Sequence, residues 1–339
     1  MNLPGIGRLR GLDKIRGRTG FCTVLGANCG NNLLDSTKSQ ADYEPCGGGK
    51  VTSVKRMCFV IYAYGDDGSD AKKERVTAVS VIAGYEDWWQ DLESKWVARC
   101  GGIPFHANEC ESDLGDYKNI PHEQNKALYR DLTTLLAESR VGGIAIAVDL
   151  IAQHKVFPGS LELSYYRAFL ECLTRTAELG KNLGEVAELT FDISSENEYN
   201  AGLLYKTMRE GDPELLTWLH PRISFIPAKE SARVQTGDLL AYEAWKALDH
   251  TVGQARRKRR SWEVLRDTGR FETYSYSEEW FEDLKRHIES GHLGKKVGFS
   301  EKDYIAWLAQ RNRQHNMSTL IEFLDWIGRR DERQGRGKV

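Results

Sequence analysis

Strand-like and helix-like segments alternate regularly between residues 58 and 250, and this alternation limits the possible folds more than any other feature. Residues 58–64 and 75–83 are apolar and rich in β-branched and aromatic side chains, which predicts two strands joined by a glycine-rich turn at 65–70. Residues 85–99 carry tryptophans at helical spacing, which predicts a helix that packs these rings into the core. The further predicted elements are helices at 123–139, 161–180, 199–210 and 232–250, strands at 142–149, 186–193 and 222–227, and an extended piece at 103–106. The pattern predicts an α/β fold with a mixed β-sheet flanked by helices.

The first 56 residues differ from the rest of the chain. They hold ten glycines and show neither a helical nor an alternating apolar period. The run from Gly47 to Lys50 lacks the spacing of a phosphate-binding loop, because Glu44 and Val51 stand where that loop needs glycine and Ser or Thr. We expect residues 1–56 to be a disordered extension, or an over-extension of the reading frame with Met57 rather than Met1 as the true start.

Charge is unevenly distributed along the chain, although the formal net charge is only −2. Residues 57–250 carry 31 acidic and 19 basic groups, whereas residues 251–339 carry 14 acidic and 19 basic groups. An acidic middle does not attract a polyanion through its overall field, but clustered carboxylates favour a divalent cation. No apolar run approaches the roughly 18 residues of a membrane helix, and the seven cysteines include no C-x-x-C pair. We therefore expect a cytoplasmic protein with no membrane partner.

Acidic side chains stand at the ends of several predicted strands and on one predicted helix. Carboxylates that converge there repel one another, and Mg²⁺ or Mn²⁺ relieves the repulsion. Two such ions, about 3.5–4 Å apart, clamp the attacking and leaving oxygens of a phosphodiester. Acids at element ends also act as turn formers and helix caps, and this second interpretation stays open. The candidate residues are Asp66, Asp67, His106, Glu109, Asp192 and Asp238.

Four motifs carry a resemblance to a known family. In chain order they are AYGDDGSD, VSVIAGYEDWWQDLESKW, FHANE and VQTGDLLAYE. Together they resemble the domain of unknown function 3800 family over about residues 57–250, although Gly68-Ser69 reverses the family's Ser-Gly and Gly237 replaces its common alanine. The resemblance implies a ribonuclease H-like fold for this part of the chain.

The resemblance also implies a metal-dependent nuclease or phosphoesterase, with a two-metal-ion site that takes Mg²⁺ or Mn²⁺. Asp66 would take the central place of the first-strand carboxylate, with Asp67 as the alternative because of the reversed Ser-Gly. Glu109, Asp192 and Asp238 would be the further ligands.

Two polar side chains would support that site. His106 would orient a ligand or transfer a proton near neutral pH. Gln235 would hold a carboxylate by a hydrogen bond. The alternative function is a non-catalytic module on the same fold that binds nucleic acid or a protein partner.

Residues after 250 form the basic part of the chain. We expect a helical accessory region at 251–328 and a disordered basic tail at 329–339. A dense run of cations follows the predicted Asp238 helix and would either contact nucleic-acid phosphates or form a solvated face. The run consists of Arg256, Arg257, Lys258, Arg259 and Arg260.

Overall fold

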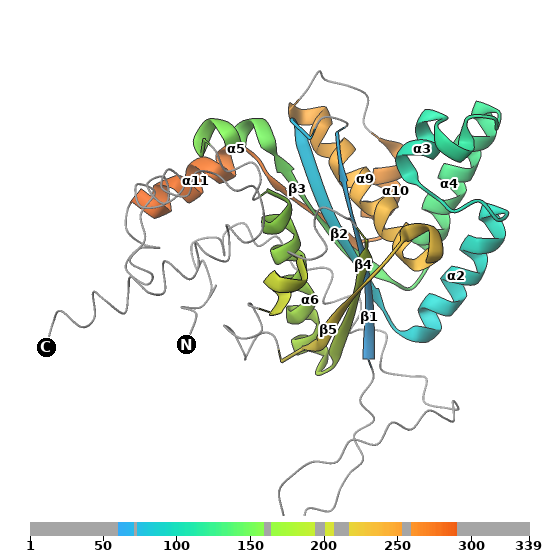
Figure 1. Ribbon diagram of the computed structural model, residues 1–339, viewed down its shortest axis with the longest axis horizontal. Helices are drawn as coiled ribbons and strands as arrows, with labels where there is room; N and C mark the ends of the chain where they lie inside the picture. The colour runs from blue at the N-terminus through green and yellow to red at the C-terminus, as the bar shows by residue number, and fades with distance from the viewer. Residues whose placement is uncertain are drawn as a thin grey trace, which may run out of the picture.

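A six-stranded mixed sheet forms the centre of the fold (Figure 1). The computed structural model describes residues 60–70, 73–158, 164–193, 201–206, 217–252 and 259–289. The strands are β1 (Val60–Ser69), β2 (Val76–Gly84), β3 (Gly142–Asp149), β4 (Val186–Asp192), β5 (Leu219–Ile226) and β6 (Phe271–Tyr276). Their order across the sheet is β5-β4-β1-β2-β3-β6. β2 is antiparallel to both β1 and β3, and the pairs β1–β4, β4–β5 and β3–β6 are parallel.

Helices cover both faces of this sheet, as the alternating sequence predicts. They are α2 (Glu86–Cys100), α3 (Ala107–Ser112), α4 (His122–Glu138), α5 (Leu150–Val156), α6 (Ser164–Leu183), α9 (Ala232–Val252), α10 (Arg260–Asp267) and α11 (Glu278–Glu289), with short 3₁₀ turns η2 (Gly115–Tyr117) and η4 (Ala228–Glu230). α9 packs on β1, β2 and β3, while α6 packs on β2, β3 and β4 from the opposite side (Figure 1). The central strands β2 and β3 are buried along their whole length, which explains their near-continuous apolar sequence.

The tryptophans of α2 are core residues, as predicted. Trp89 and Trp96 are fully buried, and Trp88 is 8% exposed. Trp89 packs edge-on against Tyr64 of β1, and its indole N–H donates to the Tyr62 carbonyl oxygen at 2.9 Å. Trp89 therefore joins α2 to the sheet, whereas the Trp96 indole N–H donates to Gln235 of α9.

β1 extends further than the sequence pattern predicts. Residues 65–70 were expected to form a turn, but residues up to Ser69 pair with β2 as regular strand. The glycines here serve close packing, because a Cβ at Gly65 would collide with the Phe191 ring and with the carbonyl oxygen of Ser80. The turn follows instead at Asp70, whose carboxylate accepts hydrogen bonds from three backbone N–H groups of the next residues. Asp66 and Asp67 therefore lie on a paired strand of the sheet and not in a turn.

The region after residue 250 also differs from the expectation of helices alone. Residues 271–276 form β6, which pairs with β3 and adds a sixth strand to the sheet. Its sequence, FETYSY, is short but rich in aromatic and β-branched residues, a strand signal that the expectation of helices missed. The proposals for residues 1–56, Met57 and 329–339 lie outside the described residues. Within the described part of the chain, no helix is both long and apolar enough to span a membrane.

Candidate functional site

Two of the predicted carboxylates lie side by side on neighbouring strands. β1 and β4 run parallel, and the register pairs Gly65 with Phe191. Asp66 and Asp192 are the next residue on each strand. Because side chains alternate between the faces of a sheet, the face of Asp66 is also that of Gly68, at which a Cβ would touch Ala241 of α9. Asp66 therefore faces α9.

Asp67 points to the other side of the sheet. The main influences on the pKa of Tyr165, on α6, are burial and then the charge of Asp67, and both raise it. α6 covers the face opposite α9. The alternation along β1 thus separates two adjacent aspartates, and of the two only Asp66 shares a face with α9. Asp67 contributes a backbone N–H, which donates to Oδ1 of Asp66 at 2.7 Å.

A close approach between α9 and β1 brings Asp238 to Asp66. A Cβ at Gly237 would lie 3.1 Å from the backbone N of Asp66 and from the carbonyl carbon of Gly65. The Ser80 hydroxyl donates to the Gly237 carbonyl oxygen at 2.8 Å and so ties α9 to β2 at the same place. Asp238 is the next residue on the helix, and it is only 6% exposed. Gly237 thus allows the contact that positions Asp238.

The first residue of α3 binds Asp238. The backbone N–H of Ala107 donates to Oδ2 of Asp238 at 2.7 Å. Nδ1 of His106 lies 3.8 Å from the same oxygen, and the His106 ring is 53% exposed. Asp238 is thus buried, whereas the adjacent imidazole reaches solvent.

Burial raises the pKa values of all three aspartates, and neighbouring carboxylates add to this for Asp66 and Asp238. The pKa of Asp66 lies well above its ordinary value because the group is buried and because Asp238, Asp67 and Asp192 are close. Burial also raises the pKa of Asp238, with further contributions from Asp192 and Glu109.

Asp192 follows the same trend. Burial raises its pKa. The backbone N–H of Ala228, which donates to Oδ1 of Asp192 at 2.6 Å, lowers it. His106 lowers the pKa of both Asp192 and Asp238. In the described part of the chain, no lysine or arginine is among the main influences on these three carboxyls. Among the described residues, His106 is the positively charged side chain that most affects this cluster.

Glu109 lies near this cluster but is turned aside. Its carboxylate packs against Gly115, which has φ +52° and where a Cβ would collide with both carboxylate oxygens. Glu109 still contributes to the raised pKa of Asp238. Its side chain would need to rotate to join the aspartates directly.

Gln235 does not hold a carboxylate, contrary to the sequence hypothesis. Its Oε1 accepts from the Trp96 indole N–H at 3.0 Å and from the Phe105 backbone N–H at 3.1 Å. Its Nε2 donates to the Ala228 carbonyl oxygen at 2.9 Å. The amide therefore connects α9 to α2, to Phe105 and to η4.

The prediction that the basic run contacts phosphates is wrong for Arg259. That side chain is 12% exposed and pairs with Glu243 and Glu111, both at 2.7 Å. Glu243 is fully buried, so Arg259 neutralises an interior charge rather than facing solvent. Arg260 begins α10 and is exposed. Arg256, Arg257 and Lys258 lie outside the described residues.

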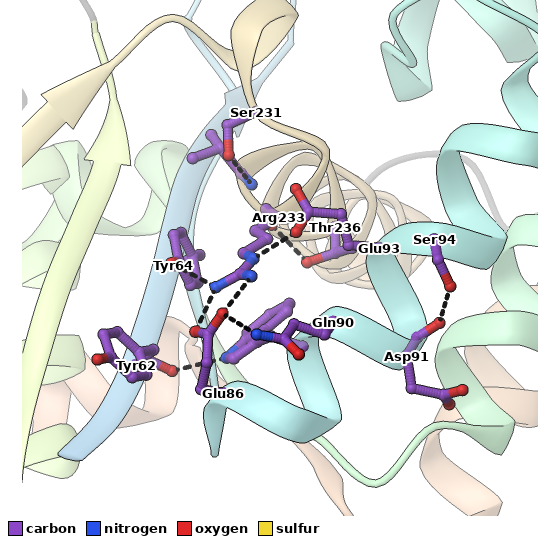
Figure 2. Close-up of polar contacts among 12 residues, drawn as sticks. Tyr62, Tyr64, Glu86, Gln90, Asp91, Glu93, Ser94, Ser231, Arg233 and Thr236 are labelled. Carbon is purple, nitrogen blue, oxygen red and sulfur yellow. Dashed lines mark hydrogen bonds and ion pairs between the residues drawn. The ribbon is translucent and has the colours of Figure 1, made fainter. Parts of the chain in front are cut away.

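Arg233 is a structural residue that the sequence pattern did not single out. Figure 2 shows it at the start of α9, between Glu86 and Glu93 of α2 and Tyr64 of β1. Its guanidinium donates to both oxygens of Glu86 at 2.8 Å, to Glu93 at 2.9 Å and to the Tyr64 hydroxyl at 3.0 Å. Arg233 and Glu86 are 147 positions apart, so no local pattern could have indicated the pair. These contacts join the start of α9 to α2 and β1.

The described residues contain no group of three or more His, Cys, Asp or Glu side chains gathered closely enough to hold a metal ion. The carboxylates therefore lie near one another without forming a closed ligand shell. A scan against protein-family models found no match to the chain, and a search among curated proteins found no relative.

Proposed function

We propose that this chain is a metal-dependent nuclease or related phosphoesterase that acts on nucleic acid. We also propose that its core is ribonuclease H-like, as the sequence resemblance implies. The proposal is supported by the origin of its carboxylates, since Asp66 comes from the first strand, Asp192 from a later parallel strand and Asp238 from a helix packed on the sheet. That distribution is the one the resemblance implies for a two-metal-ion site.

The gathering of buried carboxyls from two strands and a helix is the observation that carries the proposal. Burial raises the pKa values of these three carboxyls, that of Asp66 is raised further by Asp238, Asp67 and Asp192, and the opposing groups are backbone N–H groups and His106. Such a cluster costs folding free energy when it is ionised, and a divalent cation removes that cost.

The available donors suit a hard cation. Asp66, Asp192 and Asp238 offer carboxylate oxygens, which are the ligands that Mg²⁺ and Mn²⁺ prefer. Glu109 supplies a fourth carboxylate once its side chain turns from Gly115. When bound, the metal neutralises charge on the phosphodiester and acidifies a water. The ligands would have to lie closer together than they do in this structure.

The protein's own groups orient these carboxylates and move protons. The backbone N–H groups of Ala107 and Ala228 hold one oxygen each of Asp238 and Asp192 and so fix the orientation of both carboxylates. His106, half exposed beside Asp238, is placed to exchange a proton between the site and solvent.

Calorimetric titration of the full chain with Mn²⁺ tests the proposal. We expect the parent to bind, and Asp66→Asn and Asp238→Asn to lose binding at least tenfold. Asp149→Asn is the matched control, because Asp149 is also a buried strand-end aspartate but caps α5 through the Ala152 N–H at 2.9 Å. A parent that binds should then cleave single- or double-stranded DNA or RNA with Mg²⁺.

Two results would overturn the proposal. The first is a parent that binds no Mn²⁺ at millimolar concentration, either alone or with a nucleic-acid oligonucleotide present. The second is equal binding by the parent, Asp66→Asn and Asp238→Asn, which would place the metal elsewhere.

A further inference from the structure

Gln235 connects three segments around the aspartate cluster. It lies on α9 one turn before Asp238 and is 5% exposed. Its carbonyl oxygen accepts from α2 through Trp96 and from the chain before α3 through Phe105, while its amide nitrogen donates to η4 through Ala228. Both ends of the amide are therefore engaged.

Two of these segments supply the N–H groups that bind the carboxylates. Ala107, two residues after Phe105, donates to Asp238 at 2.7 Å. Ala228, whose carbonyl oxygen Gln235 holds, donates through its own N–H to Asp192 at 2.6 Å. One side chain thus binds both of the segments that contact the carboxylates, and it touches neither carboxylate.

We propose that Gln235 is the positioning residue of this site: it sets Ala107 on Asp238 and Ala228 on Asp192 at the same time. This inference rests on the proposed function, because it concerns the proposed metal site. The hydrogen bonds of Gln235 that it describes are present without metal. The position requires an acceptor and a donor on one side-chain end, which glutamine provides and neither leucine nor an ionised glutamate does. A fully satisfied buried amide also restricts its partners to one arrangement.

The two ends of the amide can be tested separately by substitution. Gln235→Met keeps the length of the side chain and removes both hydrogen-bonding ends. Gln235→Glu keeps the acceptor for Trp96 and Phe105 whatever its protonation state. Gln153→Met is the matched control, because Gln153 is 1% exposed and hydrogen-bonded to Ser164. It lies on α5, which packs on α11, β2 and β3.

Amide hydrogen exchange of the metal-free full chain, followed by NMR, is the first readout. We expect Gln235→Met to speed exchange at both Ala107 and Ala228 by about fivefold or more. In Gln235→Glu the Ala107 amide should exchange as slowly as in the parent. In Gln153→Met both amides should stay at the parent rate, whatever happens to overall stability.

Mn²⁺ affinity is the second readout. We expect about a tenfold or larger loss in Gln235→Met, a smaller loss in Gln235→Glu and no change in Gln153→Met. Unchanged exchange at both amides in Gln235→Met would overturn the inference. A quickened Ala107 amide in Gln235→Glu would also overturn it, and this test remains decisive if Gln235→Met does not fold.

The failures of the two proposals are distinguishable. A parent that binds no Mn²⁺ refutes the metal site, while the exchange comparison still decides whether Gln235 positions Ala107 and Ala228. A parent and a Gln235→Met variant that bind Mn²⁺ equally well refute the positioning role and leave the metal site standing.

Discussion

For Arg259, a solvent-facing role and an interior role predict different effects of substitution on the free energy of unfolding. Its guanidinium donates to Glu243 at 2.7 and 2.9 Å and pairs with Glu111 at 2.7 Å. Glu243 is fully buried, and it also accepts a hydrogen bond from the Tyr129 hydroxyl. Arg259→Met would remove the cation from this group and leave the glutamate charge in the interior.

The expected cost follows from the exposure of each partner. Breaking a buried ion pair on one side costs about 3–5 kcal/mol, because the remaining charge stays desolvated. Glu111 is 34% exposed, so water compensates it and its pair contributes about 0–1 kcal/mol. Burial of Glu243 therefore dominates, and we expect Arg259→Met to lower the free energy of unfolding by about 3–5 kcal/mol.

Urea unfolding followed by tryptophan fluorescence measures this loss, provided that the slope against urea is unchanged. Arg260→Met is the matched control, since Arg260 is the next residue and is exposed; it should change stability by less than about 0.5 kcal/mol. Adding Glu243→Gln to Arg259→Met should recover about 2 kcal/mol, because the uncompensated charge disappears. A loss below about 1 kcal/mol in Arg259→Met would refute the reasoning.

Two further predictions concern the aspartate cluster. Because burial raises the pKa of Asp66, the metal-free fold binds a proton there at a higher pH than the unfolded chain does. The contribution of Asp66 to stability should therefore rise as pH falls through this raised pKa, and Asp66→Asn should flatten that rise in thermal unfolding; an equally steep rise in the variant would contradict this. Gly237→Val should cost about 1–3 kcal/mol in urea unfolding, because its Cβ meets the backbone of β1. Gly202→Val, where a Cβ meets only the Phe225 ring at 3.9 Å, is the control, and equal losses would contradict the close approach.

Much of the fold follows from local patterns. The apolar runs predict β2, β3 and β4 closely, and the helical spacing of Trp89 and Trp96 correctly predicts their burial. The mixed sheet flanked by helices is confirmed. β6 was missed although its aromatic and β-branched residues favour a strand, because it is short and lies between segments with helical patterns; its place beside β3 is seen only in the fold.

The site was predictable only as a set of candidates. Strand ends and the helix motif indicate Asp66, Asp192 and Asp238, and the structure brings these three together. It turns Glu109 against Gly115 and gives Gln235 backbone partners instead of a carboxylate. Rotamers and hydrogen-bond partners of this kind depend on neighbours that are remote in sequence.

The order of residues was enough to establish the α/β class, the positions of most elements and the acids at their ends, because propensity and apolar periodicity are local properties. Only the folded chain decided that Asp66 rather than Asp67 faces α9, and that Arg259 turns inward. Those outcomes depend on which face of a strand meets which helix. Ala107 and Asp238, for example, are 131 positions apart and touch only when α9 docks on β1.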